Sequence, residues 1–370
     1  MLALALLGDS LLYAVLPLHA ATFGISLSWA GVLLSANRIT RLVVYSLLVR
    51  IATAAGLRRF TIGVAAAGAI STLAFAAGTG GSALLAARIA WGIAFGGLSL
   101  ATLAYATVSS DGAGTRVGLS FALREVGPVV SLTAGVLLVT ALGVRPALAI
   151  LGAASMVAIP LAMLLPDRAI GPDQEPAAAD RWRFQHPTHH EVLSAMVGLV
   201  ADGIYPATLA LLFAPTAGVS GAVVAAGTFL MLKRAAVVVL SPVTGRAAER
   251  FGENATTAAG TVGTAAGALL IACGSIIAGS ALLVCSAAVT ATSIPLTATS
   301  YDTHVRMRVL ARLGLARDAG AAAGPLVAVA LLGLAGTPVV YLFASLLLFG
   351  TVGSFVSAHA NIRDHARDRQ

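Results

Sequence analysis

Long apolar stretches, separated by short polar or Gly/Pro-rich breaks, follow one another along almost the whole chain. A helix needs about 20 predominantly apolar residues to cross the hydrocarbon core of a bilayer. Cutting the first half at its breaks gives six such stretches: Leu2–Ala21, Trp29–Ile51, Phe60–Ala77, Ala83–Val108, Val117–Leu142 and Pro146–Leu165. The second half gives six more: Val192–Ala214, Ser220–Val243, Ala255–Gly274, Ser280–Ser300, Leu310–Leu334 and Val339–Ala358. The pattern predicts an all-α, polytopic membrane protein with 12 transmembrane helices.

The long polar stretch Pro166–Glu191 lies between the sixth and the seventh apolar segment. We therefore expect an N-terminal six-helix bundle at 1–166, a cytoplasmic linker at 167–191, a C-terminal six-helix bundle at 192–360 and a cytoplasmic tail at 361–370. Asp9 interrupts the first apolar stretch, and no basic region precedes it. This stretch is predicted to be a retained span rather than a cleaved signal peptide.

The composition agrees with a membrane protein. Of the 370 residues, 58% are hydrophobic and 10% are charged, whereas about a quarter of the residues of a soluble protein are charged. A soluble enzyme, a disordered chain and a disulfide-rich secreted domain are excluded. Cys273 and Cys285 both lie in apolar runs and are predicted to be small buried side chains. We expect no metal or other cofactor.

The net charge of +8 is a topology signal in such a chain, and we expect no nucleic-acid partner. The connections after odd-numbered spans contain one charged residue, Arg145. The connections after even-numbered spans and the tail contain 15 arginines: Arg50, Arg58, Arg59, Arg116, Arg168, Arg181, Arg183, Arg246, Arg250, Arg306, Arg308, Arg312, Arg363, Arg367 and Arg369. By the positive-inside rule these connections are cytoplasmic, as are both termini. The predicted location is the inner cell membrane.

Charged residues recur at one fixed separation in the two halves. Three sites are repeated 193 residues apart: Asp9 and Asp202, Arg41 and Arg234, and Arg124-Glu125 and Arg317-Asp318. Charged residues inside spans are costly and rare, so three matches at one offset indicate a duplication. Two six-helix halves of the same orientation form a parallel repeat, related by an axis along the membrane normal.

Eleven charged residues lie in the interior of predicted spans, away from the span ends: Asp9, Arg38, Arg41, Arg88, Arg124, Glu125, Asp202, Lys233, Arg234, Arg317 and Asp318. Each costs about 2.5–3.5 kcal/mol at mid-bilayer on insertion scales, so we expect them to face the protein interior. In the functional interpretation they line a shared cavity. There the acidic groups Asp9, Glu125, Asp202 and Asp318 take up protons, and Arg38, Arg41, Arg88, Arg124 and Arg317 balance them or hold an anionic solute.

The alternative is structural. The same charges would then form interhelical ion pairs, or extend to the headgroups from the helix ends. We expect this role for Lys233 and Arg234. Arg38 and Arg41 share one helix face. Arg124 and Glu125 point about 100° apart on their helix and are predicted not to pair with each other.

Twelve spans in two halves around a polar loop, with cytoplasmic termini, resemble the major facilitator superfamily over nearly the whole chain. The sequence Gly245-Arg246-Ala247-Ala248-Glu249-Arg250-Phe251-Gly252 is similar to the gating-loop motif of that superfamily, with Glu249 in place of Asp. The loop after the second span keeps Gly56, Arg58 and Arg59 but has Val49 and Thr53 where the motif has Gly and Asp. Arg88-Ile89-Ala90-Trp91-Gly92 resembles the motif whose arginine is implicated in proton coupling.

Two Gly-Pro sequences extend the resemblance. Gly127-Pro128 looks like the antiporter motif of the superfamily, and Gly320-Ala321-Ala322-Ala323-Gly324-Pro325 is a fuller form of it. Glycine lets neighbouring backbones approach closely, and proline bends a helix. These residues are therefore expected to serve helix packing and bending, and the resemblance implies export rather than import.

Together these patterns predict a secondary active transporter rather than an enzyme. It would move a small organic solute by alternating access, coupled to protons and in the direction of export. The expected partners are the solute, protons and the lipid bilayer, and the expected state is a monomer. The alternatives are uptake of a small anionic solute by the same fold, or a transporter-derived membrane sensor or scaffold.

Overall fold

The computed structural model describes residues 1–106, 123–167, 187–297 and 303–367. Most of the predicted linker, the last three residues of the predicted tail and Arg116 of the orientation argument lie outside these ranges. The chain divides into two compact units. The first unit is Met1–Asp180 with Leu209–Met231, and the second unit is Arg181–Thr208 with Leu232–Gln370. The predicted domain limits remain a prediction.

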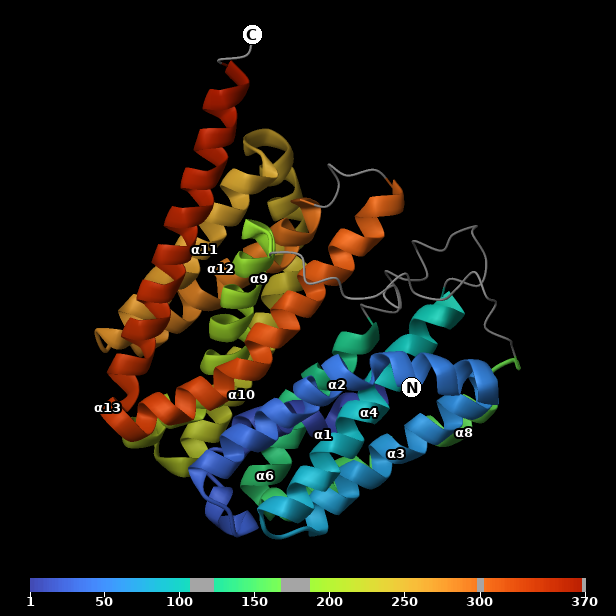
Figure 1. The fold of residues 1–370 in the computed structure, drawn as a ribbon. Coiled ribbons are helices and arrows are strands. Elements are labelled where there is room, and N and C mark those ends of the chain that lie inside the picture. The colour runs from blue at the N-terminus through green and yellow to red at the C-terminus, as the bar shows by residue number, and fades with distance from the viewer. Residues whose placement is uncertain (107–122, 168–186, 298–302, 368–370) are drawn as a thin grey trace. The chain divides into compact units, whose positions relative to one another are not determined.

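The described part of the first unit is built from helices (Figure 1). They are α1 (Leu2–Val15), η1 (Ala20–Phe23), α2 (Leu27–Ala55), α3 (Leu57–Ala77), α4 (Gly81–Ala106), the π-helical turn η2 (Ser131–Gly135), α6 (Val136–Leu142), α7 (Val144–Ser155) and α8 (Ala158–Met163). Helix α4 packs against α2 and α3, and α3 packs against α7. Leu6, Phe60, Trp91 and Leu98 belong to the core between these helices.

The second unit is helical in the same way. Its elements are α9 (His189–Val197), the π-helical turn η5 (Gly198–Ile204), both ends of α10 (Tyr205–Phe251), α11 (Glu253–Ala272), α12 (Ile276–Leu296) and α13 (Thr303–Arg367). Helix α11 packs against α12, and α13 packs against α9, η5 and α11. Leu193, Val352 and Phe355 form a core cluster between α9 and α13.

Within the described ranges, 8 helices are long and apolar enough to cross a membrane, and 9 if the pair Leu27–Tyr45 and Leu47–Ala55, bent by 62°, counts as one span. Two of the 8 each cover two predicted spans: His189–Phe251, which is broken at Gly218, and Arg312–Ser357, which is broken at Gly336. Helix α1, with 14 residues, is shorter than a typical span. With α1 counted and both broken helices divided, the twelve predicted segments are recovered. The all-α, polytopic prediction is confirmed.

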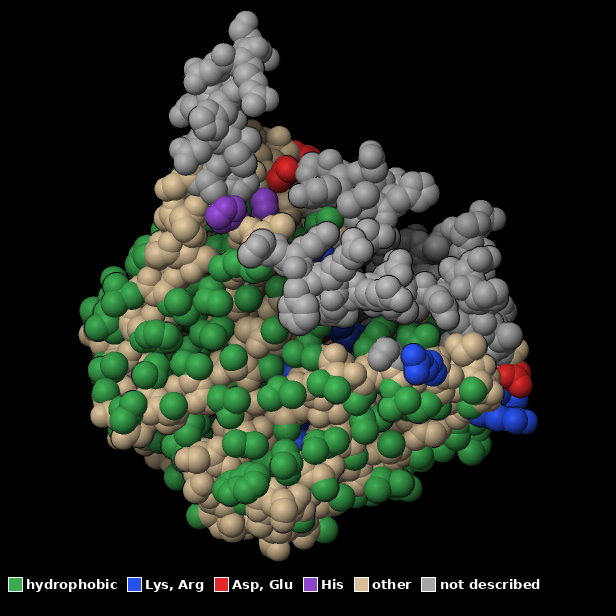
Figure 2. Space-filling model, in the orientation of Figure 1, with side chains coloured by type: hydrophobic (Ala, Val, Ile, Leu, Met, Phe, Trp, Pro, Cys, Tyr) green, Lys and Arg blue, Asp and Glu red, His purple; other side chains and the backbone are tan. Residues whose placement is uncertain are grey.

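The surface shows why the chain needs a bilayer. Large hydrophobic side chains are exposed, among them Val43 (73%), Leu164 (81%) and Leu334 (82%). Figure 2 shows hydrophobic side chains over the visible face with few charged ones among them. The prediction that Cys273 and Cys285 are buried is wrong, because both are exposed. Lipid tails are as apolar as a protein core, so an apolar run in a span does not have to face inward. The chain is an integral, multi-pass membrane protein.

Candidate functional site

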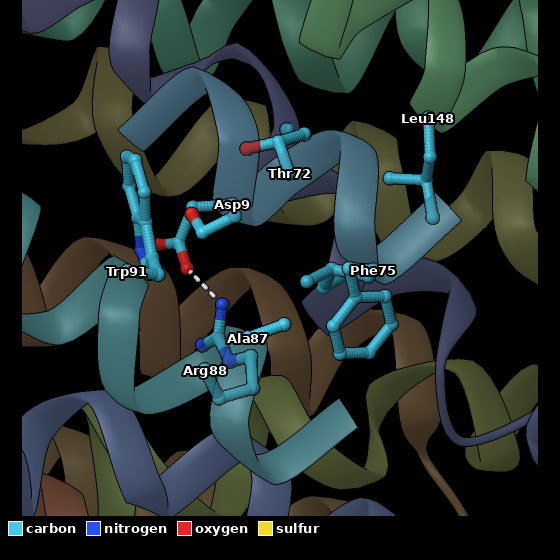
Figure 3. Close-up of a pocket in the computed structure, with 10 residues that line it drawn as sticks. Asp9, Thr72, Phe75, Ala87, Arg88, Trp91 and Leu148 are labelled. Carbon is cyan, nitrogen blue, oxygen red and sulfur yellow. Dashed lines mark hydrogen bonds and ion pairs between the residues drawn. The ribbon is translucent and has the colours of Figure 1, made fainter. Parts of the chain in front are cut away.

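Asp9 lies on α1 in a closed ion pair with Arg88 of α4 (Figure 3). The Nη1 atom of Arg88 lies 2.6 Å from Oδ1 of Asp9, and its Nε donates to the carbonyl oxygen of Leu33 at 3.0 Å. Asn37 of α2 donates from Nδ2 to the same Asp9 oxygen at 3.3 Å. The Arg88 side chain is only 2% exposed. Arg88 of α4 thus neutralises the half-buried Asp9 carboxylate, and Asn37 of α2 adds a hydrogen bond to it.

Small residues allow these helices to meet. A Cβ on Gly8 would lie 2.3 Å from Cγ2 of Thr72, and a Cβ on Gly92 would lie 2.7 Å from the carbonyl oxygen of Asn37. Gly92 is one helical turn beyond Arg88 and therefore shares its helix face. The glycine brings α4 against α2 at the level where Arg88 reaches Asp9.

The cavity beside Asp9 is too small for an organic solute. It is lined in part by Gly8, Thr72, Arg88 and Trp91, and its volume is about 10 Å³. That volume is close to the lower limit for a single water molecule. Nη2 of Arg88 and Nε1 of Trp91 are buried and make no hydrogen bond within the described residues. The Asp9 site can therefore hold a charge and a water molecule, but it does not bind a solute by itself.

Arg38 and Arg41 of α2 contact aromatic side chains in the first unit. Nε of Arg38 donates to the hydroxyl of Tyr13 at 3.4 Å, and that hydroxyl donates to the carbonyl oxygen of Leu34 at 3.3 Å. The guanidinium carbon of Arg41 lies 4.6 Å from the ring centre of Phe95. A cation over an aromatic face is stabilised by the ring, so these two arginines have contacts that sequence reasoning did not name.

Asp202 lies in η5 of the second unit, and two cations approach it. Nζ of Lys233 lies 2.6 Å from Oδ1 of Asp202, and Nε of Arg317 lies 2.7 Å from Oδ2. Lys233 also donates to the carbonyl oxygen of Ala201. The exposed fractions are 18% for Asp202, 14% for Lys233 and 22% for Arg317. This site is less enclosed than the Asp9 site.

Backbone-to-backbone packing holds η5 against α13. A Cβ on Gly203 would lie 2.6 Å from Cα of Gly324, and a Cβ on Gly320 would lie 1.8 Å from the carbonyl oxygen of Ala195. At the matched glycine of the first unit, Gly127, a Cβ would lie 2.0 Å from the carbonyl oxygen of Ala3. Pro128 and Pro325, which follow these glycines, are buried. The residues of the two Gly-Pro sequences therefore lie at close helix contacts in both units.

The prediction that Arg124 and Glu125 do not pair is wrong. Nη2 of Arg124 lies 2.9 Å from Oε1 of Glu125. Both side chains are long, and their flexible stems make up for the angle of about 100° between their Cα–Cβ directions. Asp318, the match of Glu125, is half-buried.

Each predicted gating loop contains one sharp turn, and residues 245–251 of the second loop are helical rather than a loop. Gly56 joins α2 to α3 with φ +81°, and Gly252 joins α10 to α11 with φ +88°, conformations that only glycine adopts without strain. Arg58 donates to the carbonyl oxygen of Met163 at the end of α8. Gly245 lies inside α10, and the neighbouring side chains of the motifs, Arg59, Glu249 and Arg250, are exposed.

Sequence reasoning missed three contacts of charged groups. Lys233 was expected to have a structural role such as an interhelical ion pair, and it forms one with Asp202, a partner that the sequence did not identify. Arg145 donates to the carbonyl oxygens of Ala76, Ala77 and Thr22. It thus caps the end of α3, where positive charge is favourable. Glu191 of α9 pairs with Arg312 at 2.5 Å. Of these three contacts, the sequence contained a signal for one: a lysine inside a predicted span, Lys233, needs a partner. In the described residues, no group of three or more His, Cys, Asp or Glu side chains could hold a metal ion.

No family model and no curated protein matches this sequence. Solved structures do match. The nucleoside transporter NupG superposes with a TM-score of 0.73 at 14% identity, over 96% of this chain and 97% of that one. Its D323A mutant gives 0.71 at 14% identity, over 96% and 99%. The human organic anion transporter MFSD10 (TETRAN) gives 0.63 at 20% identity, over 96% and 97%. At these identities the comparison shows the fold alone. The chain has the major facilitator fold.

Proposed function

We propose that this protein is a secondary active transporter that moves a small organic solute by alternating access and couples export of the solute to protons. The observation that carries the proposal is the ion pair between Asp9 and the buried Arg88. Polar and ionisable residues inside a membrane are costly and by default indicate a functional site. The fold, shared with two kinds of solute transporter, supports the same conclusion.

The charge balance of the Asp9 site supports proton coupling. With Asp9 ionised, Arg88 has a counterion at 2.6 Å. When Asp9 is protonated, Arg88 is left as a buried cation without that counterion, a state that costs several kcal/mol. The protonated site therefore favours any conformation in which Arg88 finds another partner or water. A proton taken up at Asp9 would in this way shift the equilibrium between the two access states.

The test measures solute flux in everted membrane vesicles that contain the full chain. Radiolabelled uridine and benzoate are suitable probes, because one structural neighbour is a nucleoside transporter and another an organic anion transporter. With acid inside, we expect accumulation of a probe that a protonophore abolishes. Asp9→Asn should lose gradient-driven accumulation but keep passive equilibration of the probe. Asp167→Asn, which changes an exposed carboxylate, serves as the matched control and should accumulate normally.

Three results would contradict parts of the proposal. Flux that does not respond to the protonophore would remove proton coupling. Accumulation only in right-side-out vesicles with acid outside would replace export by uptake, the alternative expected for a small anionic solute. Binding of a probe without net flux in either orientation would favour a membrane sensor or scaffold over a transporter.

A further inference from the structure

The Asp202 carboxylate is shared between two cations. Lys233 lies on one of its oxygens at 2.6 Å and Arg317 lies on the other at 2.7 Å. These three side chains together carry one excess positive charge. Arg234 follows Lys233 and Asp318 follows Arg317, so the adjoining residues add one charge of each sign and leave the excess unchanged. Excess charge is costly inside a membrane, and a bound anion would remove that cost.

Both cations have hydrogen-bond donors to spare. A guanidinium has five N–H groups, and Arg317 uses the one on Nε for Asp202. Its Nη1 and Nη2 make no hydrogen bond within the described residues, and neither of them is fully buried. Lys233 uses two of its three donors, on Asp202 and on the carbonyl oxygen of Ala201. The unused pair Nη1 and Nη2 is one that can bind the two oxygens of a carboxylate side by side.

The backbone that carries Arg317 is held firmly. A Cβ on Gly198 would lie 2.3 Å from the carbonyl oxygen of Arg317, so η5 and α13 touch at this residue. The contact between Gly203 and Gly324 fixes the same pair of helices about two turns further along. A cation that starts from a fixed backbone loses less entropy when it binds a ligand.

We propose that Lys233 and Arg317 form a binding site for the carboxylate group of a small organic anion, and that Asp202 is a built-in competitor for this site. The carboxylate of the anion would accept hydrogen bonds from Nη1 and Nη2 of Arg317 and from the free donor of Lys233. Release of Asp202 from either cation would strengthen the binding. This inference rests on the proposed transporter function and names the substrate class.

The matched Asp9 site does not meet the requirements of an anion site, because it has neither an accessible cation nor room for an organic anion. Arg88 is 2% exposed, and the cavity beside it holds about 10 Å³. A carboxylate with an organic body does not fit into that volume, which is the space of about one water molecule. Of these two matched sites, we therefore assign the anion site to Lys233 and Arg317.

The experiment measures equilibrium binding of radiolabelled benzoate to the detergent-purified full chain. Asp202→Asn removes the competing charge but keeps a similar shape, and we expect the Kd for benzoate to fall at least about tenfold, that is by about 1.4 kcal/mol. Arg317→Gln should raise the Kd at least about tenfold. Arg317→Lys keeps the charge but removes the paired Nη1 and Nη2 donors, and it should give an intermediate Kd. This variant keeps the test valid if the glutamine variant does not fold.

The matched control is Glu191→Gln, the same change from carboxylate to amide beside an arginine of α13. It should leave the Kd unchanged. Unlabelled benzoate should displace the label, whereas the neutral analogue benzamide and inorganic phosphate should not. Absence of benzoate binding to Asp202→Asn, an unchanged Kd in that variant, or equal displacement by benzamide or phosphate would each overturn the inference. Since binding at equilibrium needs no flux, uridine transport in the vesicle assay would then leave the proposed function standing.

Discussion

Two carboxylates at matched positions in the repeat, Asp9 and Asp202, have different surroundings. Asp9 is paired with one cation from α4, and that cation, Arg88, is almost completely buried. Asp202 is paired with two cations, from α10 and α13, that are 14% and 22% exposed. The first arrangement is a closed pair with no charge left over. The second keeps excess positive charge and accessible donors.

The matched arginines differ in the same way. Arg124 pairs with its neighbour Glu125 on one helix, whereas Arg317, 193 residues later, reaches across to Asp202 on another helix. The duplication has therefore kept the positions of the charges without keeping their partners. A position in a helix is set by the sequence alone, but a partner depends on which neighbouring helix lies within reach of a long side chain.

The largest loss of stability is expected at the Asp9 site, where one cation pairs with one carboxylate. Arg88→Met should lower the free energy of unfolding by about 3–5 kcal/mol, because it leaves Asp9 buried without its counterion. The measurement is an SDS titration of the purified protein. Adding Asp9→Leu to Arg88→Met should recover most of the loss, as a double-mutant cycle can show. If the single variant were as stable as the wild type, Asp9 would have to be solvated by some other route.

A smaller loss is expected where two cations share one carboxylate. Lys233→Met should lower the free energy of unfolding by about 1.5–3 kcal/mol, the usual value for a hydrogen bond to a charged group, since Arg317 still neutralises Asp202. The same titration gives the comparison with Arg88→Met. A loss from Lys233→Met that equals or exceeds that from Arg88→Met would break the distinction between the two sites.

The glycine contacts that the two units share should respond alike. Gly127→Ala and Gly320→Ala each place a Cβ 2.0 Å or less from a backbone carbonyl oxygen. Forcing the helices apart should cost about 1–3 kcal/mol in either unit, as overpacking does in other cores. Gly350→Ala, where a Cβ meets nothing within 4 Å, is the control and should be neutral in the thermal unfolding midpoint. Sensitivity in only one unit would show that the two contacts are not equivalent.

The smallest change in stability is expected for the ion pair between Arg124 and Glu125, which lie on the same helix. Arg124→Gln should change the free energy of unfolding by less than about 1 kcal/mol, because partly exposed ion pairs contribute little and this one is 32% and 20% exposed. Arg317→Gln at the matched position should cost more in the same titration. Equal losses would mean that the position in the repeat, rather than the partner, decides the contribution of the arginine.

Several features of the site could be predicted from the sequence, and others could not. The separation of 193 residues located Asp9 and Asp202 as a matched pair, and the resemblance singled out Arg88. Nothing in the spacing showed that Arg88 would reach Asp9, or that Lys233 would reach Asp202, because these contacts join helices that are far apart in the chain. Arg145 is an exception to the positive-inside rule, and nothing in the sequence explains it. The structure supplies the reason, because Arg145 donates to carbonyl oxygens at the end of α3.

The sequence by itself determined that this is a polytopic membrane protein, and it determined the number and order of the apolar helices. The reason is that the cost of placing polar backbone and charged side chains in hydrocarbon acts on each segment separately. Only the tertiary structure decided which charges neutralise each other, and therefore which site is closed and which keeps free donors. Ion pairing acts over a few ångströms between side chains, and that distance is set by helix packing rather than by order along the chain.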